Sequence, residues 1–146
     1  MHEFVEHLIE DHEKQRALGE RLKNAADADG RKDMRERMQE ELLPHMAGEE
    51  ASIFPYMRDS GDRKADKHAL EAVQEHHAAR TVLREIMDLS LESEIFSAKA
   101  TVLVEMNEHH MDEEESTHFV WLKKHASKEQ LDALYEAYEK AEKAEE

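Results

Sequence analysis

The sequence predicts an all-α protein: an antiparallel up-down-up-down four-helix bundle with a short C-terminal fifth helix. Its 146 residues include only four Gly and two Pro, and strong helix formers dominate. Apolar residues recur at helical spacing within long segments. The breaks between these segments are short, and short connections between long helices favour antiparallel neighbours.

The breaks lie at 27–30, 60–62, 90–93 and near Ser127, so the expected helices cover about 2–26, 31–58, 63–89, 93–125 and 128–144. Pro44 and Pro55 lie within the second segment. Each is expected to kink the helix rather than end it, because the apolar period continues through both. Ser127-Lys128-Glu129-Gln130 has the pattern of a capping box that starts the last helix. We expect one domain over 1–146, with the bundle over about 2–125.

Each of the first four helices has one histidine in the middle of its apolar stripe, and the second and fourth add a glutamate one turn later. These residues are His12, His45 with Glu49, His76, and His110 with Glu114. We also expect Tyr56, Val73, Met87 and Trp121 in the core.

Composition excludes several classes of function. A formal net charge of −16 argues against binding to nucleic acid or to an anionic membrane surface. The absence of cysteine excludes disulfides, thiolate metal sites and iron–sulfur clusters. The N-terminus is acidic where a signal peptide is basic, and no apolar run is long enough to span a bilayer. We therefore expect a cytoplasmic protein, and its eleven histidines need an explanation.

The two halves of the sequence repeat one pattern. Residues 45–54 read HMAGEEASIF and residues 110–119 read HMDEEESTHF, an offset of 65, while His12 and His76 are 64 apart. Two helical hairpins related by a pseudo-two-fold axis would bring the four histidines and two glutamates to one level of the bundle.

This set of residues suits metal ions. A histidine four residues before an acid is weak evidence alone, but these pairs lie on apolar stripes, where an unpaired carboxylate is costly to bury. Four imidazoles and two carboxylates suit two borderline-hard cations, iron before manganese, with the carboxylates able to bridge them. One alternative is a set of core polar residues that satisfy one another. Another is a single zinc, which prefers four ligands and would leave two carboxylates over.

The pattern DH…HxxxEE…EH…HxxxEE begins at Asp11 and ends at Glu115, and it resembles the hemerythrin-like, or HHE cation-binding, family over the chain up to about residue 125. The resemblance implies a four-helix bundle around a non-haem di-iron centre, two iron ions bridged by oxide or hydroxide. It implies that the two glutamates bridge the metals and that the ligands are His12, His45, Glu49, His76, His110 and Glu114.

The sequence departs from the oxygen-carrying hemerythrins at two positions. Arg80 stands where they have a fifth histidine, and Glu114 follows His110 by four residues where they have an aspartate five residues on. The four-His, two-Glu set looks more like the di-iron domains of iron–sulfur cluster repair proteins and of a eukaryotic iron-sensing ubiquitin ligase subunit. The repair proteins usually carry a cysteine-bearing N-terminal segment, which this chain lacks. Without a fifth histidine, both irons could keep an open coordination position.

Residues around the expected centre have several possible roles. His118, one turn after Glu114, could be an additional metal ligand, a hydrogen-bond donor near the centre or a buried core histidine. Glu50 and Glu115 could accept hydrogen bonds from ligand imidazoles or be solvated, and Arg80 could pair with either. His77 and His109 are expected at the surface.

The leading hypothesis is a di-iron protein that binds or senses small oxidants, namely dioxygen, peroxide or nitric oxide. One alternative is iron buffering or storage. Another is a di-iron oxidase, peroxidase or nitric-oxide-handling enzyme, which would need an electron donor from elsewhere. A ferritin-like enzyme is disfavoured, because that architecture uses Glu-x-x-His twice and this chain has it only at Glu115 to His118. Nothing in the sequence indicates an oligomeric state.

Overall fold

A computed structural model describes residues 1–145, and every regular element among them is helical. A π-helical turn, η1 (Glu114–His118), joins two of the α-helices. The α-helices are α1 (Glu3–Asn24), α2 (Ala28–Ala51), α3 (Ile53–Arg58), α4 (Arg63–Asp88), α5 (Phe96–Glu113), α6 (Phe119–His125) and α7 (Lys128–Glu145). The all-α prediction is therefore confirmed.

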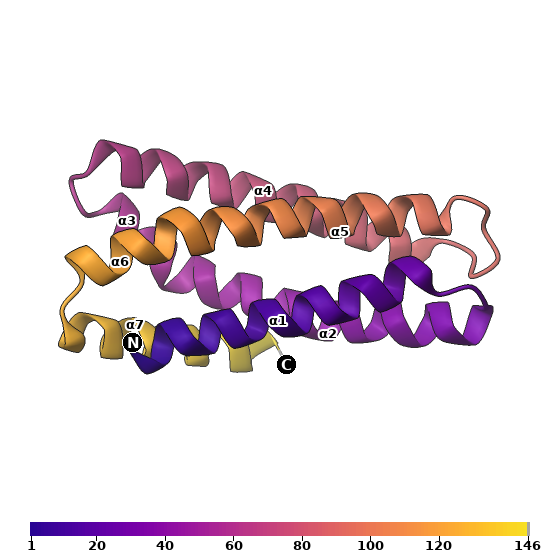
Figure 1. Cartoon of the computed structure of the whole chain (residues 1–146), viewed down its shortest axis with the longest axis horizontal. Coiled ribbons are helices and arrows are strands. Elements are labelled where there is room, and N and C mark those ends of the chain that lie inside the picture. The colour runs from indigo at the N-terminus through magenta and orange to yellow at the C-terminus, as the bar shows by residue number, and fades with distance from the viewer. Residues whose placement is uncertain (146) are drawn as a thin grey trace.

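The four long helices α1, α2, α4 and α5 form an antiparallel bundle. α1 packs against α2 and α5, and α4 packs against α5 and α2, so the four helices close a ring. Figure 1 shows successive long helices running in opposite directions, with short connections at the two ends. α7 lies along α2 and also contacts α1. The bundle with a fifth helix is as predicted.

The helix starts follow from side-chain caps. Asp27 accepts a hydrogen bond from the Gly30 amide at 2.7 Å, and α2 therefore begins at Ala28, three residues before the predicted start. Before α7, the Ser127 amide donates to Gln130 Oε1 at 2.8 Å and the Gln130 amide donates to Ser127 Oγ at 3.1 Å. This reciprocal pair is the predicted capping box.

The prediction for Pro55 is wrong. The α-helix continues through Pro44, as expected, but the segment 31–58 is divided at Ser52, whose backbone leaves the helical region at φ −127° and ψ −80°. Pro55 has no N–H to donate to the Ala51 carbonyl, and its ring would clash with that carbonyl in a continuous helix. α2 therefore ends at Ala51, and α3 restarts with Pro55 in its first turn, where the N–H is not needed.

The segment predicted as one helix over 93–125 is also interrupted. α5 begins at Phe96, and the helix passes through the π-helical turn η1 before it resumes as α6. A π-helical turn is uncommon and is often found at functional sites. Here it begins at Glu114, one of the two repeated glutamates.

The core consists of two apolar clusters at different levels of the bundle. One lies towards α3 and α6 and includes Phe4, Leu8, Ile53, Phe54 and Phe119. The other lies towards the opposite end and includes Leu22, Met38, Leu42, Leu83 and Leu103. Between Leu8 and Leu22 of α1 lies His12, so a buried polar level separates the two clusters.

Four residues expected in the core are only partly buried: Tyr56, Val73, Met87 and Trp121. Two of them keep a polar tip near water. The Trp121 indole donates to Asp62 at 3.0 Å, and the Tyr56 hydroxyl donates to Gln130 at 3.1 Å. Such side chains bury their rings and leave the polar end accessible.

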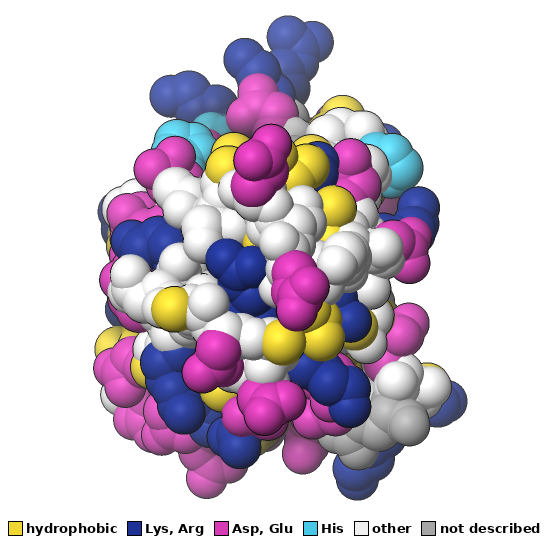
Figure 2. Space-filling model, turned by 90° about the vertical axis from the view of Figure 1, so that its right-hand side faces the viewer, with side chains coloured by type: hydrophobic (Ala, Val, Ile, Leu, Met, Phe, Trp, Pro, Cys, Tyr) yellow, Lys and Arg dark blue, Asp and Glu magenta, His cyan; other side chains and the backbone are white. Residues whose placement is uncertain are grey.

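The end of the bundle where α1 meets α2 and α4 meets α5 carries acidic and basic side chains side by side, with small apolar patches between them (Figure 2). Arg31 and Arg35 on α2 contribute there: they donate to the Leu91 and Leu89 carbonyls at 2.8 Å and 3.0 Å, after the end of α4. Within residues 1–145, no helix combines the length and apolar character that a membrane span requires.

Candidate metal centre

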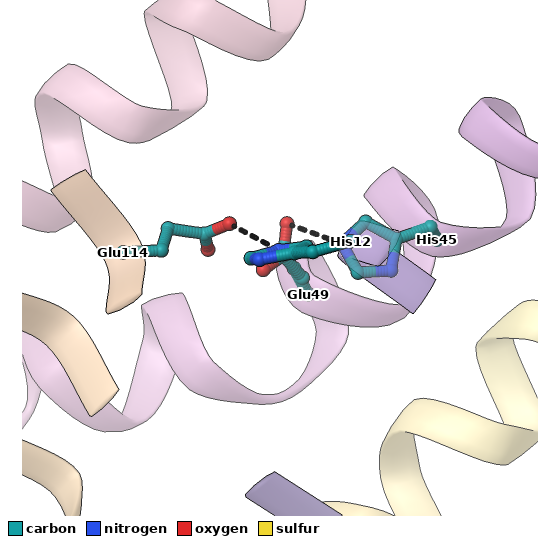
Figure 3. A group of neighbouring side chains, drawn as sticks. All are labelled: His12, His45, Glu49 and Glu114. Carbon is teal, nitrogen blue, oxygen red and sulfur yellow. Dashed lines mark ion pairs between the residues drawn. The ribbon is translucent and has the colours of Figure 1, made fainter. Parts of the chain in front are cut away.

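Six polar side chains from α1, α2, α4, α5 and η1 meet at the level between the two apolar clusters. All six are at most 5% exposed. Their ligand atoms form two groups in which every atom lies within 4.8 Å of the others: one contains His12, His45, Glu49 and Glu114, and the other contains Glu49, His76 and His110. Figure 3 shows the first group with the side chains turned towards one another. The structure therefore brings together all six residues singled out from the sequence.

Glu49 lies between the two histidine pairs. Its Oε1 atom is 3.4 Å from His45 Nε2, on its own helix, and 3.1 Å from His76 Nε2, on α4. One carboxylate oxygen therefore faces one histidine of each group. The carboxylate has a second oxygen, Oε2, that is buried and makes no hydrogen bond.

Glu114 occupies the equivalent position in the second half of the chain. Its Oε1 atom is 3.2 Å from His12 Nε2 and 3.3 Å from His110 Nε2. The ion pairs from His12 to Glu114 and from His45 to Glu49 are the dashed lines of Figure 3. Each glutamate thus faces one histidine from each half, as a pseudo-two-fold arrangement requires.

A carboxylate lies against the outer nitrogen, Nδ1, of each of the four histidines. The pairs are His12 with Glu115 at 2.6 Å, His45 with Asp11 at 3.0 Å, His76 with Glu50 at 2.7 Å and His110 with Glu75 at 2.9 Å. A carboxylate can only accept, so Nδ1 carries a proton, and each imidazole in its neutral form presents the Nε2 lone pair to the centre. Metal-binding histidines characteristically have such a partner on the other ring nitrogen.

Each of these carboxylates comes from a different helical element than the histidine it pairs with. Asp11 precedes His12 in the sequence but pairs with His45, and Glu75 precedes His76 but pairs with His110. The two carboxylates that follow Glu49 and Glu114 are each shared with an arginine: Glu50 accepts from Arg80 at 2.7 Å, and Glu115 lies 2.9 Å from Arg16. The arginine positive charge offsets the charge of each outer carboxylate.

Several buried atoms at the centre have no hydrogen bond. They are Nε2 of His12, Nε2 of His45, Oε2 of Glu49 and both carboxylate oxygens of Glu114. Leaving such atoms unpaired in a core costs free energy, which a cation between them would offset. Two donors bound at about 2.1 Å to one ion lie about 3.0–3.4 Å apart. The N···O distances of 3.1–3.4 Å between these histidines and glutamates match that spacing, so the residues fit bound metal.

The histidines and glutamates of the metal-free centre shift one another's pKa values. Burial disfavours the charged form of His45, but the negative charge of Glu49 and the hydrogen bond to Asp11 outweigh it and raise the pKa of His45 well above its usual value. For His110, burial is likewise outweighed by Glu114, and the pKa rises. Burial would raise the pKa of Glu49, yet the neighbouring His45 lowers it well below its usual range. Without metal, protons on the histidines therefore balance the carboxylates.

His118 is 1% exposed, and neither ring nitrogen makes a hydrogen bond. It lies at the end of η1, and its ring stacks on that of His68 with centroids 5.6 Å apart. It belongs to neither of the two groups of ligand atoms at the centre. The expectation that His77 and His109 lie at the surface is confirmed, since both are exposed.

The sequence reasoning gave no role to Asp11, Arg16, Glu75 or Tyr138. Asp11 and Glu75 were visible as a repeated position, because an acid precedes both His12 and His76. Tyr138 on α7 is buried, and its hydroxyl donates to Asp11 at 2.7 Å. Burial and the nearby Asp11 charge raise the pKa of Tyr138, so the phenol stays a neutral donor. No spacing in the sequence relates this tyrosine to His45.

Comparison with known proteins agrees with this arrangement. The model of the hemerythrin HHE cation binding domain matches residues 3–122. The chain is similar to an uncharacterized hemerythrin-like protein of Schizosaccharomyces pombe, with 26% identity over 140 residues that make up 93% of this chain and 67% of that protein. No solved structure matches the chain. All six buried residues lie inside the matched region, and α7 lies outside it.

Proposed function

Because the chain belongs to the hemerythrin HHE cation-binding domain family, we propose that its buried centre holds two iron ions and binds or senses small oxidants: dioxygen, peroxide or nitric oxide. One observation carries the proposal. Histidine nitrogens and carboxylate oxygens converge in the core, and five of these atoms make no hydrogen bond: Nε2 of His12 and of His45, Oε2 of Glu49 and both carboxylate oxygens of Glu114.

The proximity of the side chains suggests which residues would hold each ion. His12 and His45 would serve one ion and His76 and His110 the other, with Glu49 and Glu114 shared between them. Imidazole and carboxylate donors without any thiolate suit iron better than softer metals. A single tetrahedral zinc would leave donors over, because four nitrogens and two carboxylates exceed four ligands.

Counting donors supports a role in binding small molecules. Four Nε2 atoms and four carboxylate oxygens make eight donors, whereas two six-coordinate ions have twelve positions. A bridging oxide or hydroxide would fill one further position on each ion, which leaves one position on each. Arg80, in the place of a further histidine, cannot ligate and is held by Glu50. When bound, iron would supply these remaining positions together with a one-electron redox couple.

The chain contributes a closed, oriented environment. Phe119 stacks on His12 with ring centroids 5.5 Å apart, and Phe54 lies 5.2 Å from His76. These rings keep water from the imidazoles. His118 is buried, makes no hydrogen bond and lies outside both groups of ligand atoms. We therefore assign it the role of a hydrogen-bond donor to a small molecule at the centre rather than that of a ligand.

Burial also favours a binding or sensing role over iron buffering. The proposed ligands are all nearly inaccessible to solvent, so an external chelator cannot contact them in the folded state. A buffer that exchanges iron rapidly would need ligands that open to water.

The proposal is tested by loading metal-free protein with Fe²⁺ under anaerobic conditions, removing the excess and measuring iron per chain. The loaded protein is then exposed to dioxygen, hydrogen peroxide or nitric oxide while visible absorption is recorded. We expect two irons per chain and a spectral response to at least one oxidant. One iron or none, or no response, would overturn the proposal, and rapid loss of iron to a mild chelator would favour buffering instead.

A further inference from the structure

Tyr138 reaches the candidate metal centre from outside the matched domain. The family match ends at residue 122, whereas Tyr138 lies on α7 (Lys128–Glu145), which packs along α2. It is fully buried and is among the largest side chains with no exposure to solvent. A helix that only covered the bundle would not need a polar atom at that depth.

Gly48 makes room for the tyrosine ring. A Cβ atom added at Gly48 would lie 2.5 Å from Cδ2 and Cε2 of Tyr138, closer than two carbon atoms can approach. The ring therefore lies directly on the α2 backbone, between His45 and Glu49 in sequence. Any residue larger than glycine at position 48 would displace the tyrosine.

The hydroxyl closes a triangle of hydrogen bonds. Tyr138 Oη is 2.7 Å from Asp11 Oδ2 and 2.8 Å from His45 Nδ1, and Asp11 Oδ2 is 3.0 Å from the same nitrogen. Asp11 can only accept, so the phenol donates to it. The His45 Nδ1–H is then shared between Asp11 and the phenol oxygen, and the proton cannot move to Nε2 without breaking both contacts.

This arrangement breaks the pseudo-two-fold pattern. Among the described residues, the outer nitrogens of His12, His76 and His110 each have one hydrogen-bond partner, a carboxylate, whereas that of His45 has two. Two of the other outer carboxylates are also bound by arginines, Arg16 and Arg80. Asp11 is instead bound by the neutral phenol of Tyr138.

We infer that Tyr138 is a positioning residue for His45, which acts by holding the Asp11 carboxylate and the His45 imidazole together so that Nε2 faces the metal. The inference rests on the proposed function and adds α7 to the part of the chain that builds the centre. It also makes the two metal positions unequal, because only the one beside His45 depends on α7.

The test uses the full chain loaded with Zn²⁺, a diamagnetic probe, and compares wild type with Tyr138→Phe. The phenylalanine ring fills the same space on Gly48, so the fold is kept. In ¹⁵N-histidine NMR spectra we expect Tyr138→Phe to shift one ligand Nδ1–H resonance, to leave the other three, and to shift the same resonance as Asp11→Asn. We also expect one of the two zinc ions to bind about 10–100-fold more weakly.

Tyr135→Phe is the matched control. Tyr135 lies on the same helix and stacks on Phe4 with ring centroids 5.2 Å apart, but its hydroxyl bonds neither Asp11 nor His45. This variant should leave all four resonances and both affinities unchanged. Gly48→Ala, which displaces the ring, should reproduce the resonance shift of Tyr138→Phe.

The outcomes separate the two proposals. If wild type binds two zinc ions but Tyr138→Phe has unchanged resonances and affinities, the positioning role is wrong and the metal centre stands. Equal weakening of both ions would also overturn the role, because Tyr138 would then act on the whole bundle. If wild type takes up no zinc, the proposed function and this inference fail together.

Discussion

The Glu115 carboxylate lies 2.6 Å from Nδ1 of His12 across the interface between two helices. Replacing Glu115 with Gln keeps the shape but removes the charge that fixes the imidazole tautomer. We predict about 10–100-fold weaker binding of at least one metal ion, measured by titration with Zn²⁺ or Fe²⁺. Glu105→Gln, an exposed change on the preceding helix α5, should bind as wild type does. Equal affinities in the two variants would contradict the assigned role of Glu115.

Removing a glutamate at the centre should have a larger effect than removing a surface histidine beside it. Glu114→Ala deletes two buried oxygens, one of which faces a histidine of each group, and we expect loss of at least one metal ion and a lower melting temperature of the loaded protein. His109→Ala, whose side chain is 74% exposed, should change neither. Metal analysis and thermal unfolding of the two variants decide the matter; similar behaviour would mean that the ligands are wrongly assigned.

The stability of the metal-free protein should peak in a mildly acidic range. The raised pKa values of His45 and His110 contribute stability that is complete below the ordinary value of 6.5 and is lost as pH rises through the folded-state pKa. The lowered pKa of Glu49 contributes stability that is present above its ordinary 4.5 and is lost on further acidification. The melting temperature of chelator-treated protein should therefore be highest between pH 4.5 and 6.5.

Bound metal should shift the pH of greatest stability away from the mildly acidic range of the metal-free protein. Bound metal needs neutral histidines, so metal binding should release protons and the pH of greatest stability should move upward. A weakly buffered titration with Zn²⁺ measures the release directly. Metal-free and loaded proteins with the same pH profile would show that the histidines are not the binding groups.

The fold could be predicted because helix formers, breaks and apolar periodicity all pointed to the same arrangement. The six central residues could be predicted because the repeat places them at equivalent positions. The helix break at Ser52 and the turn η1 could not, since each depends on local backbone geometry within a segment whose apolar period continues. The role of Tyr138 could not be predicted for another reason. Its position depends on how α7 packs against the bundle, and this packing leaves no periodic signal in the sequence.

His118 and Arg80 should tune reactivity in different ways. If His118 donates a hydrogen bond and is not a ligand, His118→Ala should retain two irons per chain but change the rate at which oxygen or peroxide oxidises them. Arg80→His places an imidazole one turn after His76 and removes the arginine that binds Glu50, so oxidation should slow. Stopped-flow absorption measures both rates. Iron loss in His118→Ala would instead identify His118 as a ligand, and unchanged rates in both variants would show that neither residue tunes the centre.

Gly48→Ala should destabilise the protein although alanine is the better helix former. The helical preference favours alanine by about 1 kcal/mol, but overpacking against the Tyr138 ring costs about 1–3 kcal/mol. We expect a fall in melting temperature of several degrees. Gly19→Ala is the comparison, because its Cβ would lie 3.2 Å from a Val104 methyl group, farther than the 2.5 Å from Gly48 to the Tyr138 ring, and its melting temperature should fall less. A stabilised Gly48→Ala would show that the ring does not rest on this backbone.

Both helices that carry a central glutamate lose regular α-helical structure just after it: α2 stops two residues beyond Glu49, and η1 begins at Glu114. The consequence is mechanical. α3 follows the first discontinuity and α6 follows the second, and both short helices lie at the same end of the bundle (Figure 1). We expect tilting of these short helices to open a passage from solvent while His12, His45 and His110 stay on α1, α2 and α5. A small molecule could then enter without any helix unfolding.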